Sequence, residues 1–127
     1  MLKVKRIYEP STKEDGHRVL VDRVWPRGFT KEKARVDEWR KDLAPSDALR
    51  KWFGHDPDKW DEFRRRYRGE LQENDRWKDL VALAQRAKTE DVTLVFSARD
   101  EERNQAVALR EMALGRGGPR SRKGKEG

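Results

Sequence analysis

The sequence predicts a single α/β domain in which a small, mostly parallel sheet of about three strands is flanked by helices. Two observations predict this class. Short, continuous and β-branched apolar runs at 19–24 and 92–96 are typical of strands buried on both faces. Between these runs, apolar side chains recur at helical spacing. A chain of 127 residues has the length of one domain.

The first strand is expected over residues 2–8, where LKVKRIY mixes apolar and basic side chains as an edge or half-exposed strand does. The residues that follow, EPSTKEDGH, are rich in turn-forming types. They are too few for a helical crossover, so the sequence leaves open whether the first and second strands pair.

Three helices are expected between the second and third strands. Pro45-Ser46-Asp47 begins the first, and Gly54 ends it. Asp56 and Pro57 then have the residue types of an N-cap and a first helical position. The next helix carries an apolar stripe at spacings of 3, 4 and 4, formed by Trp60, Phe63, Tyr67 and Leu71. A third helix begins near Trp77, and a last one, with Asp100 as its N-cap, is expected over 101–114 after the third strand.

The charge of the chain is concentrated in one segment. Charged residues make up 43% of the chain and the net charge is +7, but residues 115–127 contribute five basic side chains and one acidic side chain. We therefore expect a domain over residues 1–114 and a basic, disordered tail over 115–127. Such a tail could bind nucleic acid nonspecifically through counterion release, or it could only increase solubility.

Several classes of chemistry are absent from the sequence. Without cysteine, the chain forms no disulfide, thiolate nucleophile or cysteine zinc site. Two distant histidines and scattered acids lack metal-ligand spacing, and neither a GxSxG motif nor a phosphate-cradling glycine loop occurs. We expect no metal and no cofactor. The N-terminal residues lack a signal-peptide core and no apolar run has the length of a membrane span, so a cytoplasmic protein without a membrane partner is expected.

The segment VDRVWPRG, residues 21–28, is the main candidate for a binding site. Pro26 excludes Trp25 from helical geometry, so a strand should break into a loop here. Arg23 and Arg27 can each present a planar fork to a phosphate or carboxylate, with Asp22 orienting them and Trp25 forming a stacking or packing wall. The alternative is a structural ion pair between Asp22 and an arginine, with Trp25 in the core.

A second candidate segment follows the third strand. In FSARDEERNQA, residues 96–106, the acids at 100–102 would fill the start of a helix and leave little room for an anion. Ser97, Arg99 and Asn104 stay candidates for ligand binding. Because ligands gather at the carboxyl ends of parallel strands, these three residues and the 21–28 segment would line one crevice if the two strand ends are neighbours.

Two further features have both a functional and a structural interpretation. His55 lies between two expected helices and has a side chain suited to proton transfer near neutral pH, although a histidine in a turn is the simpler interpretation. The basic residues at 64–66 and 68 lie beside Glu62 and Glu70. They favour a solvated helix face with ion pairs over a nucleic-acid groove.

Four segments together resemble one family. KRIYEP, DGHRVLVDRVWPRG, LAPSDALRKWFGHDPDKWDEFRRRYRGEL and TLVFSARDEERNQAVAL are similar, in that order, to the YeaO-like branch of domain-of-unknown-function family 488, over about residues 4–112. The resemblance implies an α/β fold and no assigned reaction. Some members carry the label of transcriptional regulators, but no helix-turn-helix pattern is present. The family's pattern falls on Asp22, Arg23, Trp25, Pro26, Arg27, Gly28, Pro45, Ser46, Arg50, Phe53, His55, Phe63, Tyr67, Glu70, Asp100, Asn104 and Ala106.

The chain departs from its relatives at two places. Relatives often have histidine where this chain has Arg103, which argues against proton transfer at that position. Longer relatives of the wider family resemble a parallel sheet with a helix where this chain has the loop after its first strand. They also carry a cysteine near the end of the third strand, where this chain has Ser97-Ala98-Arg99. Thiol chemistry therefore cannot operate here.

The function expected from these observations is the binding of a phosphorylated or other anionic small ligand at the carboxyl ends of the strands. One alternative is an enzyme that uses Asp22 or His55 as an acid or base on such a ligand. Another is a nucleic-acid-associated or regulatory protein that contacts phosphates through its tail and residues 64–68. A third is an interaction module whose arginines are structural.

Overall fold

A four-stranded parallel sheet forms the centre of the protein. The computed structural model describes residues 1–115 of the chain. Its strands are β1 (Leu2–Arg6), β2 (His17–Leu20), β3 (Glu38–Trp39) and β4 (Val92–Phe96), in the spatial order β1-β4-β2-β3. All three pairings are parallel. The α/β class is confirmed, and the two-residue strand β3 is an addition that the sequence did not predict.

The central position of β4 explains how a short loop can connect β1 and β2. Both strands pair with β4 rather than with each other, and Leu2 and His17 both lie opposite Val92. The connecting residues 7–16 contain only a short 3-10 helix, η1 (Lys13–Asp15). All α-helices of the described residues follow β2 in the sequence.

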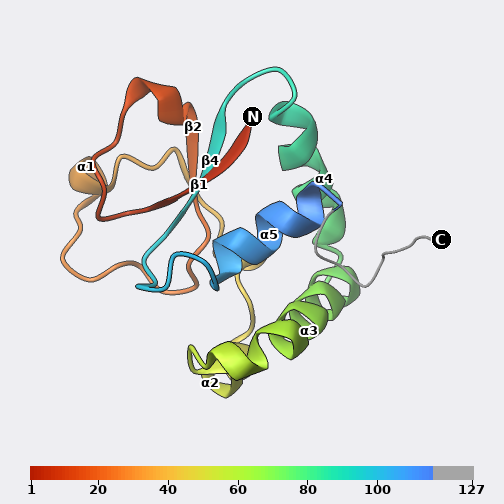
Figure 1. Ribbon diagram of the computed structural model, residues 1–127. Coiled ribbons are helices and arrows are strands. Elements are labelled where there is room, and N and C mark those ends of the chain that lie inside the picture. Colours follow the sequence, from red (N-terminus) through yellow and green to blue (C-terminus); the bar gives the residue numbers. More distant parts are fainter. Residues whose placement is uncertain (116–127) are drawn as a thin grey trace.

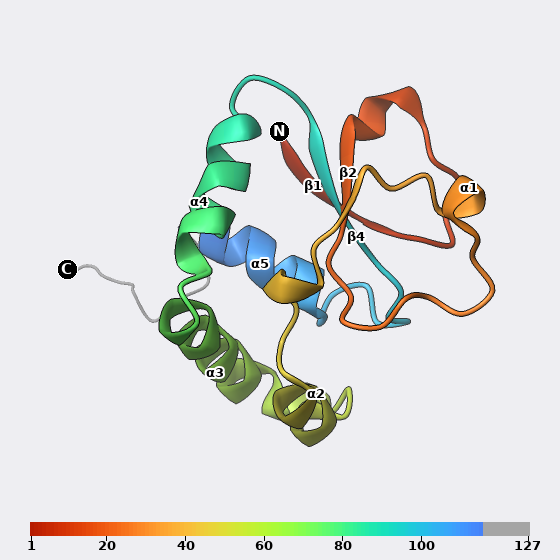
Figure 2. The same cartoon turned by 180° about the vertical axis from the view of Figure 1, so that it is seen from behind.

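Helices cover the two faces of the sheet unequally (Figures 1 and 2). On one side lie α3, α4 and α5, and on the other lies the short helix α1 with its flanking loops. The α-helices are α1 (Lys31–Ala34), α2 (Asp47–Phe53), α3 (Trp60–Glu73), α4 (Trp77–Arg86) and α5 (Gln105–Ala113). Two more 3-10 helices, η2 (Lys41–Leu43) and η3 (Pro57–Lys59), precede α2 and α3.

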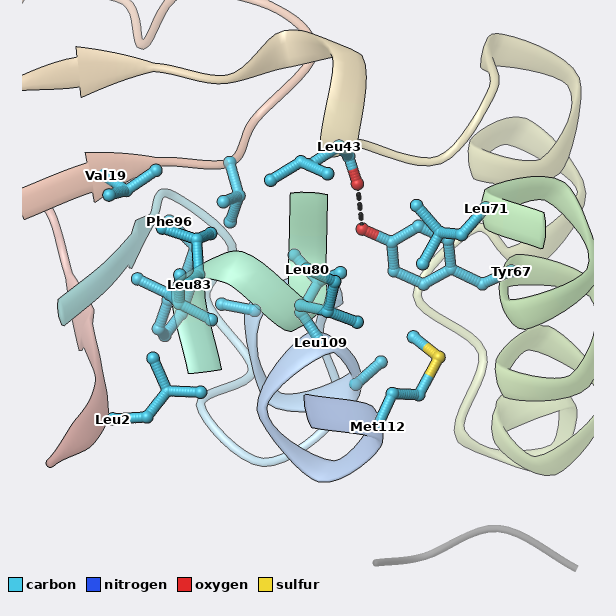
Figure 3. Packing of buried hydrophobic residues seen from close by; sticks show 14 of the residues in the cluster. Leu2, Val19, Leu43, Tyr67, Leu71, Leu80, Leu83, Phe96, Leu109 and Met112 are labelled. Carbon is cyan, nitrogen blue, oxygen red and sulfur yellow. Dashed lines mark hydrogen bonds between the residues drawn. The ribbon is translucent and has the colours of Figure 1, made fainter. Parts of the chain in front are cut away.

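Alternating residues of β2 and β4 build a separate core on each face of the sheet. Val19 and Leu94 belong to the larger core under the helices, whereas Leu20 and Val95 belong to the smaller core on the α1 side. In the larger core, Tyr67 of α3 is fully buried and its hydroxyl donates to the carbonyl of Leu43 (Figure 3). This hydrogen bond joins α3 to the 3-10 helix that follows β3.

The bounds of several elements differ from the prediction. Strand β1 ends at Arg6 rather than at Tyr8, and β2 begins at His17 rather than at Val19. Strand β2 ends at Leu20 rather than at Val24, although the Val21 amide still donates to the carbonyl of Val95 at 3.0 Å. Helix α5 begins at Gln105, and its N-cap is Asn104, whose side chain accepts from the Val107 amide at 3.0 Å.

Asp100 is therefore not the N-cap of this helix. Its carboxylate accepts from the amides of Glu102 and Arg103 at 2.9 and 3.1 Å and stabilises a separate turn. The first turn of α5 contains no acidic residue. The expectation that the acids at 100–102 fill the start of this helix was wrong.

A buried ion pair fixes the loop between β1 and β2. Asp15 and Arg18 are both almost fully buried, and their side chains meet at 2.7 Å. Arg18 also donates to the carbonyl of Ala34 at 2.9 Å, and Lys5 donates to Asp15 at 2.9 Å. The cluster thus links β1, β2 and α1.

Two other expectations concern the chain outside this core. Apart from Gly115, the basic tail predicted for residues 115–127 lies outside the described residues. Within residues 1–115, no helix has the length and apolar character needed to cross a membrane.

Candidate ligand-binding pocket

A pocket of about 160 Å³ lies where β2 and β4 end. Residues that follow the two strands form one part of its lining, and α2, α3 and the start of α5 supply the rest. The lining residues are Asp22, Arg23, Val24, Pro45, Arg50, Phe53, His55, Phe63, Ser97, Ala98, Asn104 and Gln105. The parallel pairing of β2 with β4 makes the two strand ends neighbours, as the sequence-based hypothesis required.

Asp22 is the buried carboxylate of this pocket, with 6% of its surface exposed. Ser97 Oγ donates to one carboxylate oxygen at 2.5 Å, and Gln105 Nε2 donates to the other at 2.5 Å. Burial raises the pKa of Asp22, and the hydrogen bonds from Ser97 and Gln105 offset that effect only in part. The site therefore contains an acid whose charged form is disfavoured by its surroundings.

Within the described residues, Asp22 pairs with neither arginine of its loop. Arg23 Nε donates to the carbonyl of Pro45 at 2.8 Å, which ties the loop after β2 to the segment that precedes α2. The ion pairs among residues 1–115 include none between Asp22 and an arginine. The expected role of Asp22 in orienting Arg23 and Arg27 was therefore wrong, because neutral donors occupy its oxygens: Ser97, directly after β4, and Gln105 of α5.

Two further basic side chains reach the pocket from the region of α2. Arg50 lies on α2, is about half exposed, and donates to Asp47 at 2.8 Å. His55 follows Gly54, the left-handed C-cap of α2, and itself has a positive φ of 59°. The way α2 ends thus brings the imidazole to the same pocket as the loop after β2.

Trp25 and Arg27 lie elsewhere. The Trp25 ring packs edge-to-face against Trp39 at 5.3 Å, and its Nε1 donates to the carbonyl of Phe29 at 2.7 Å. It contacts the smaller core on the opposite face of the sheet. Arg27 is exposed in the same loop and does not line the pocket. Neither side chain lines the pocket.

The residues predicted after the third strand divide between two hollows. Ser97 and Asn104 line the pocket, whereas Arg99 lines a second hollow of about 490 Å³ together with Asp100. The two hollows share His55, Ser97 and Ala98, so they adjoin at the end of β4.

Gln105 is a pocket residue that the sequence analysis missed. Its position directly after Asn104, the true N-cap, was the available signal, but the helix was expected to begin four residues earlier. Pro45, Arg50, Phe53 and Phe63 also line the pocket. All four belong to the family pattern, but the local sequence indicated only a helix start at Pro45 and an apolar stripe that includes Phe63. In the part of the chain that the structure describes, no three acidic or histidine side chains cluster as metal ligands do.

The basic run on α3 is engaged with acids of its own surface. Arg64 pairs with Asp61 and Glu111, and Glu62 pairs with the two arginines that follow Arg64. This confirms the interpretation of the run as a helix face with ion pairs.

Comparison with known proteins places the chain in a family. Residues 1–121 match the family described as the inactive DUF488-N3 subclade. The chain belongs to this family. It is 42% identical to the uncharacterized protein Rv3073c of Mycobacterium tuberculosis (strain H37Rv) over 115 residues, which cover 91% of this chain and 95% of that protein. It is 39% identical to the uncharacterized protein YeaO of Escherichia coli K12 over 108 residues, covering 85% and 92%.

These matches confirm the resemblance to the YeaO-like branch of the DUF488 family. No solved structure matches the chain.

Proposed function

We propose that this protein binds a small anionic ligand, such as a phosphorylated metabolite, in the pocket at the ends of β2 and β4. The observation that carries the proposal is the convergence of Arg23, Arg50 and His55 on one pocket. Guanidinium groups bind phosphates and carboxylates through paired, charge-assisted hydrogen bonds. The carboxyl ends of parallel strands are also where ligands of α/β proteins gather.

The hydrogen bonding of Arg23 supports this role. Arg23 Nε donates to the carbonyl of Pro45, which fixes the plane of the guanidinium group. Among the described residues, no side chain or carbonyl accepts from either Nη group of Arg23, so both can bind a ligand. The Nη2 atom of Arg50 is shared with the exposed carboxylate of Asp47, so this arginine can exchange a surface ion pair for a ligand at little cost.

The volume of the pocket suits a small ligand. About 160 Å³ is close to the ~150 Å³ cavity that holds benzene in an engineered protein. A phosphate group with a few attached heavy atoms fits such a space. Phe53 and Phe63 give the pocket an apolar part suited to a short carbon chain.

Binding without turnover is favoured over catalysis. Asp22 and His55 both line the pocket, and an acid with a raised pKa is suited to proton transfer. However, the family is described as inactive, which favours a binding role for the same residues. A nucleic-acid role has less support, because the basic run on α3 pairs with acids.

Thermal melts with inorganic phosphate, ethyl phosphate and a nucleotide panel test this proposal. At least one compound should raise the melting temperature of the wild type, since a ligand that binds only the folded state stabilises it. Arg23→Ala should abolish the shift. Arg27→Ala is the matched control, because it removes an arginine from the same loop but outside the pocket, and it should preserve the shift. No shift with any compound, or equal loss in both variants, would contradict the proposal.

A further inference from the structure

Asp22 is a buried carboxylate whose two direct side-chain partners are neutral. Ser97 Oγ and Gln105 Nε2 donate to it, and none of the ion pairs within residues 1–115 includes it. Buried charges in proteins are normally paired with an opposite charge, because removing a lone charge from water is costly. The start of α5 lies at Gln105, and its dipole compensates for only part of a full charge.

The carboxylate also has capacity for another donor. A carboxylate accepts about four hydrogen bonds. The Ser97 hydroxyl and the Gln105 amide provide two. Asp22 lines the pocket, so a ligand in the pocket can supply a further one.

The same pocket thus presents opposite charges to its contents. Arg23 and Arg50 offer guanidinium groups, while Asp22 offers a carboxylate that would repel a simple anion. Asp47 lies close enough to Arg23 to be affected by its charge, but it is exposed and already paired with Arg50. Asp22 is therefore the acid that a bound ligand must accommodate.

We propose that the ligand is a small amino-substituted anion, whose ammonium group binds Asp22 and whose phosphate or carboxylate group binds Arg23 and Arg50. This inference rests on the proposed function and specifies its ligand class. The ammonium group would supply both a further hydrogen bond and the opposite charge that Asp22 lacks. A molecule the size of 2-aminoethyl phosphate fits the volume of about 160 Å³, with its carbon chain beside Phe53 and Phe63.

Isothermal titration of the wild type with two matched pairs of compounds tests the inference. The first pair is 2-aminoethyl phosphate and ethyl phosphate, and the second is β-alanine and propionate. Members of a pair differ only in the amino group, so their difference reports its interaction. In at least one pair the amino compound should bind about tenfold tighter, as a charge-assisted hydrogen bond predicts. The pair that shows this preference identifies the anionic group.

Two acid-to-amide variants assign the preference to a residue. Asp22→Asn should abolish the preference for the amino compound and strengthen binding of the compound without it, because a repelling charge is removed. Asp100→Asn is the matched control. It changes an acid in the adjoining hollow, keeps an oxygen that can cap the turn, and should leave the preference unchanged.

The possible outcomes separate the two proposals. If at least one compound binds the wild type but neither amino compound binds tighter than its counterpart, the inference is wrong and the proposed function stands. If no compound binds, the proposed function fails and the inference fails with it. If Asp22→Asn is folded by circular dichroism and keeps the preference, Asp22 does not recognise the amino group. The wild-type comparison needs no variant and decides the inference even if Asp22→Asn does not fold.

Discussion

The carboxylate of Asp22 and the hydroxyl of Ser97 meet at 2.5 Å and join the carboxyl ends of β2 and β4. Because these strands are parallel neighbours, residues that are far apart in the sequence meet at the same end of the sheet. Gln105 then connects the start of α5 to the same carboxylate. The floor of the proposed site is thus an integral part of the fold, and changes to Asp22 affect both stability and binding.

Asp22→Asn is expected to increase stability at neutral pH. Since burial raises the pKa of Asp22, the folded state holds this proton more tightly than the unfolded state. The stabilising contribution is complete below the unfolded pKa of about 3.9 and is lost as pH rises through the folded pKa. An amide does not ionise, so the variant avoids this loss.

Denaturant unfolding from pH 3 to pH 8 measures the effect. The difference between Asp22→Asn and wild type should grow with pH and shrink toward pH 3. A variant that is less stable than wild type at pH 7 would show that the ionised carboxylate is better stabilised than its surroundings indicate.

Asp15→Ala is expected to destabilise the protein by about 3 kcal/mol. The substitution leaves the buried guanidinium of Arg18 without its acid, and breaking one side of a buried pair typically costs this much. The exposed pair between Asp61 and Arg64 provides the comparison, and Asp61→Ala should have a much smaller effect. Urea unfolding of both variants measures the difference, and equal effects would contradict the structural role of the buried cluster.

The same carboxyl predicts a loss of stability in acid. Burial alone would raise the pKa of Asp15, but hydrogen bonds from Lys5, Thr12 and Arg18 outweigh that effect and hold it below its usual value. A lowered pKa contributes stability above the unfolded pKa, and this contribution is lost as pH falls through the folded pKa. In Asp15→Ala, this component of acid destabilisation should be missing from the unfolding curves.

Two glycine-to-alanine substitutions should have opposite effects. Gly16 has φ of 65°, and a Cβ there would lie 2.1 Å from the carbonyl oxygen of Asp91. Gly16→Ala should therefore cost more than about 1 kcal/mol. Gly69 lies inside α3, where an added Cβ meets nothing within 4 Å, so Gly69→Ala should gain about 1 kcal/mol in helix propensity. Melting curves that shift both variants in the same direction would contradict this account.

The sequence predicted the fold best where local pattern and burial agree. The run at 92–96 became β4 with the expected bounds, and Gly54 ends α2 as expected. Strand β3 was missed because two residues, Glu38 and Trp39, carry no periodicity and become a strand only through pairing with β2. The start of α5 was misplaced because Asp100 and Asn104 are both good capping residues, and only the turn after β4 decides between them.

The candidate site was predicted in position but not in its partners. The rule for parallel strands correctly placed Asp22 near Ser97. Local sequence suggested an arginine as the partner of Asp22, whereas the structure uses Gln105, which is distant in the chain. The direction of Trp25 depends on its contact with Trp39, and no local pattern contains that information.

Titration of ¹⁵N-labelled wild-type protein with inorganic phosphate and with 2-aminoethyl phosphate, followed by NMR, tests the central claim most directly. The account predicts that the largest shifts fall on the amides of Asp22, Arg23, Ser97 and Gln105, and on the side-chain amide of Gln105, for at least one compound. The amide of Arg27 should change little. Shifts confined to α3 or α1 would contradict a binding site at the ends of β2 and β4, and no shift at saturating concentrations of either compound would contradict a phosphate site there.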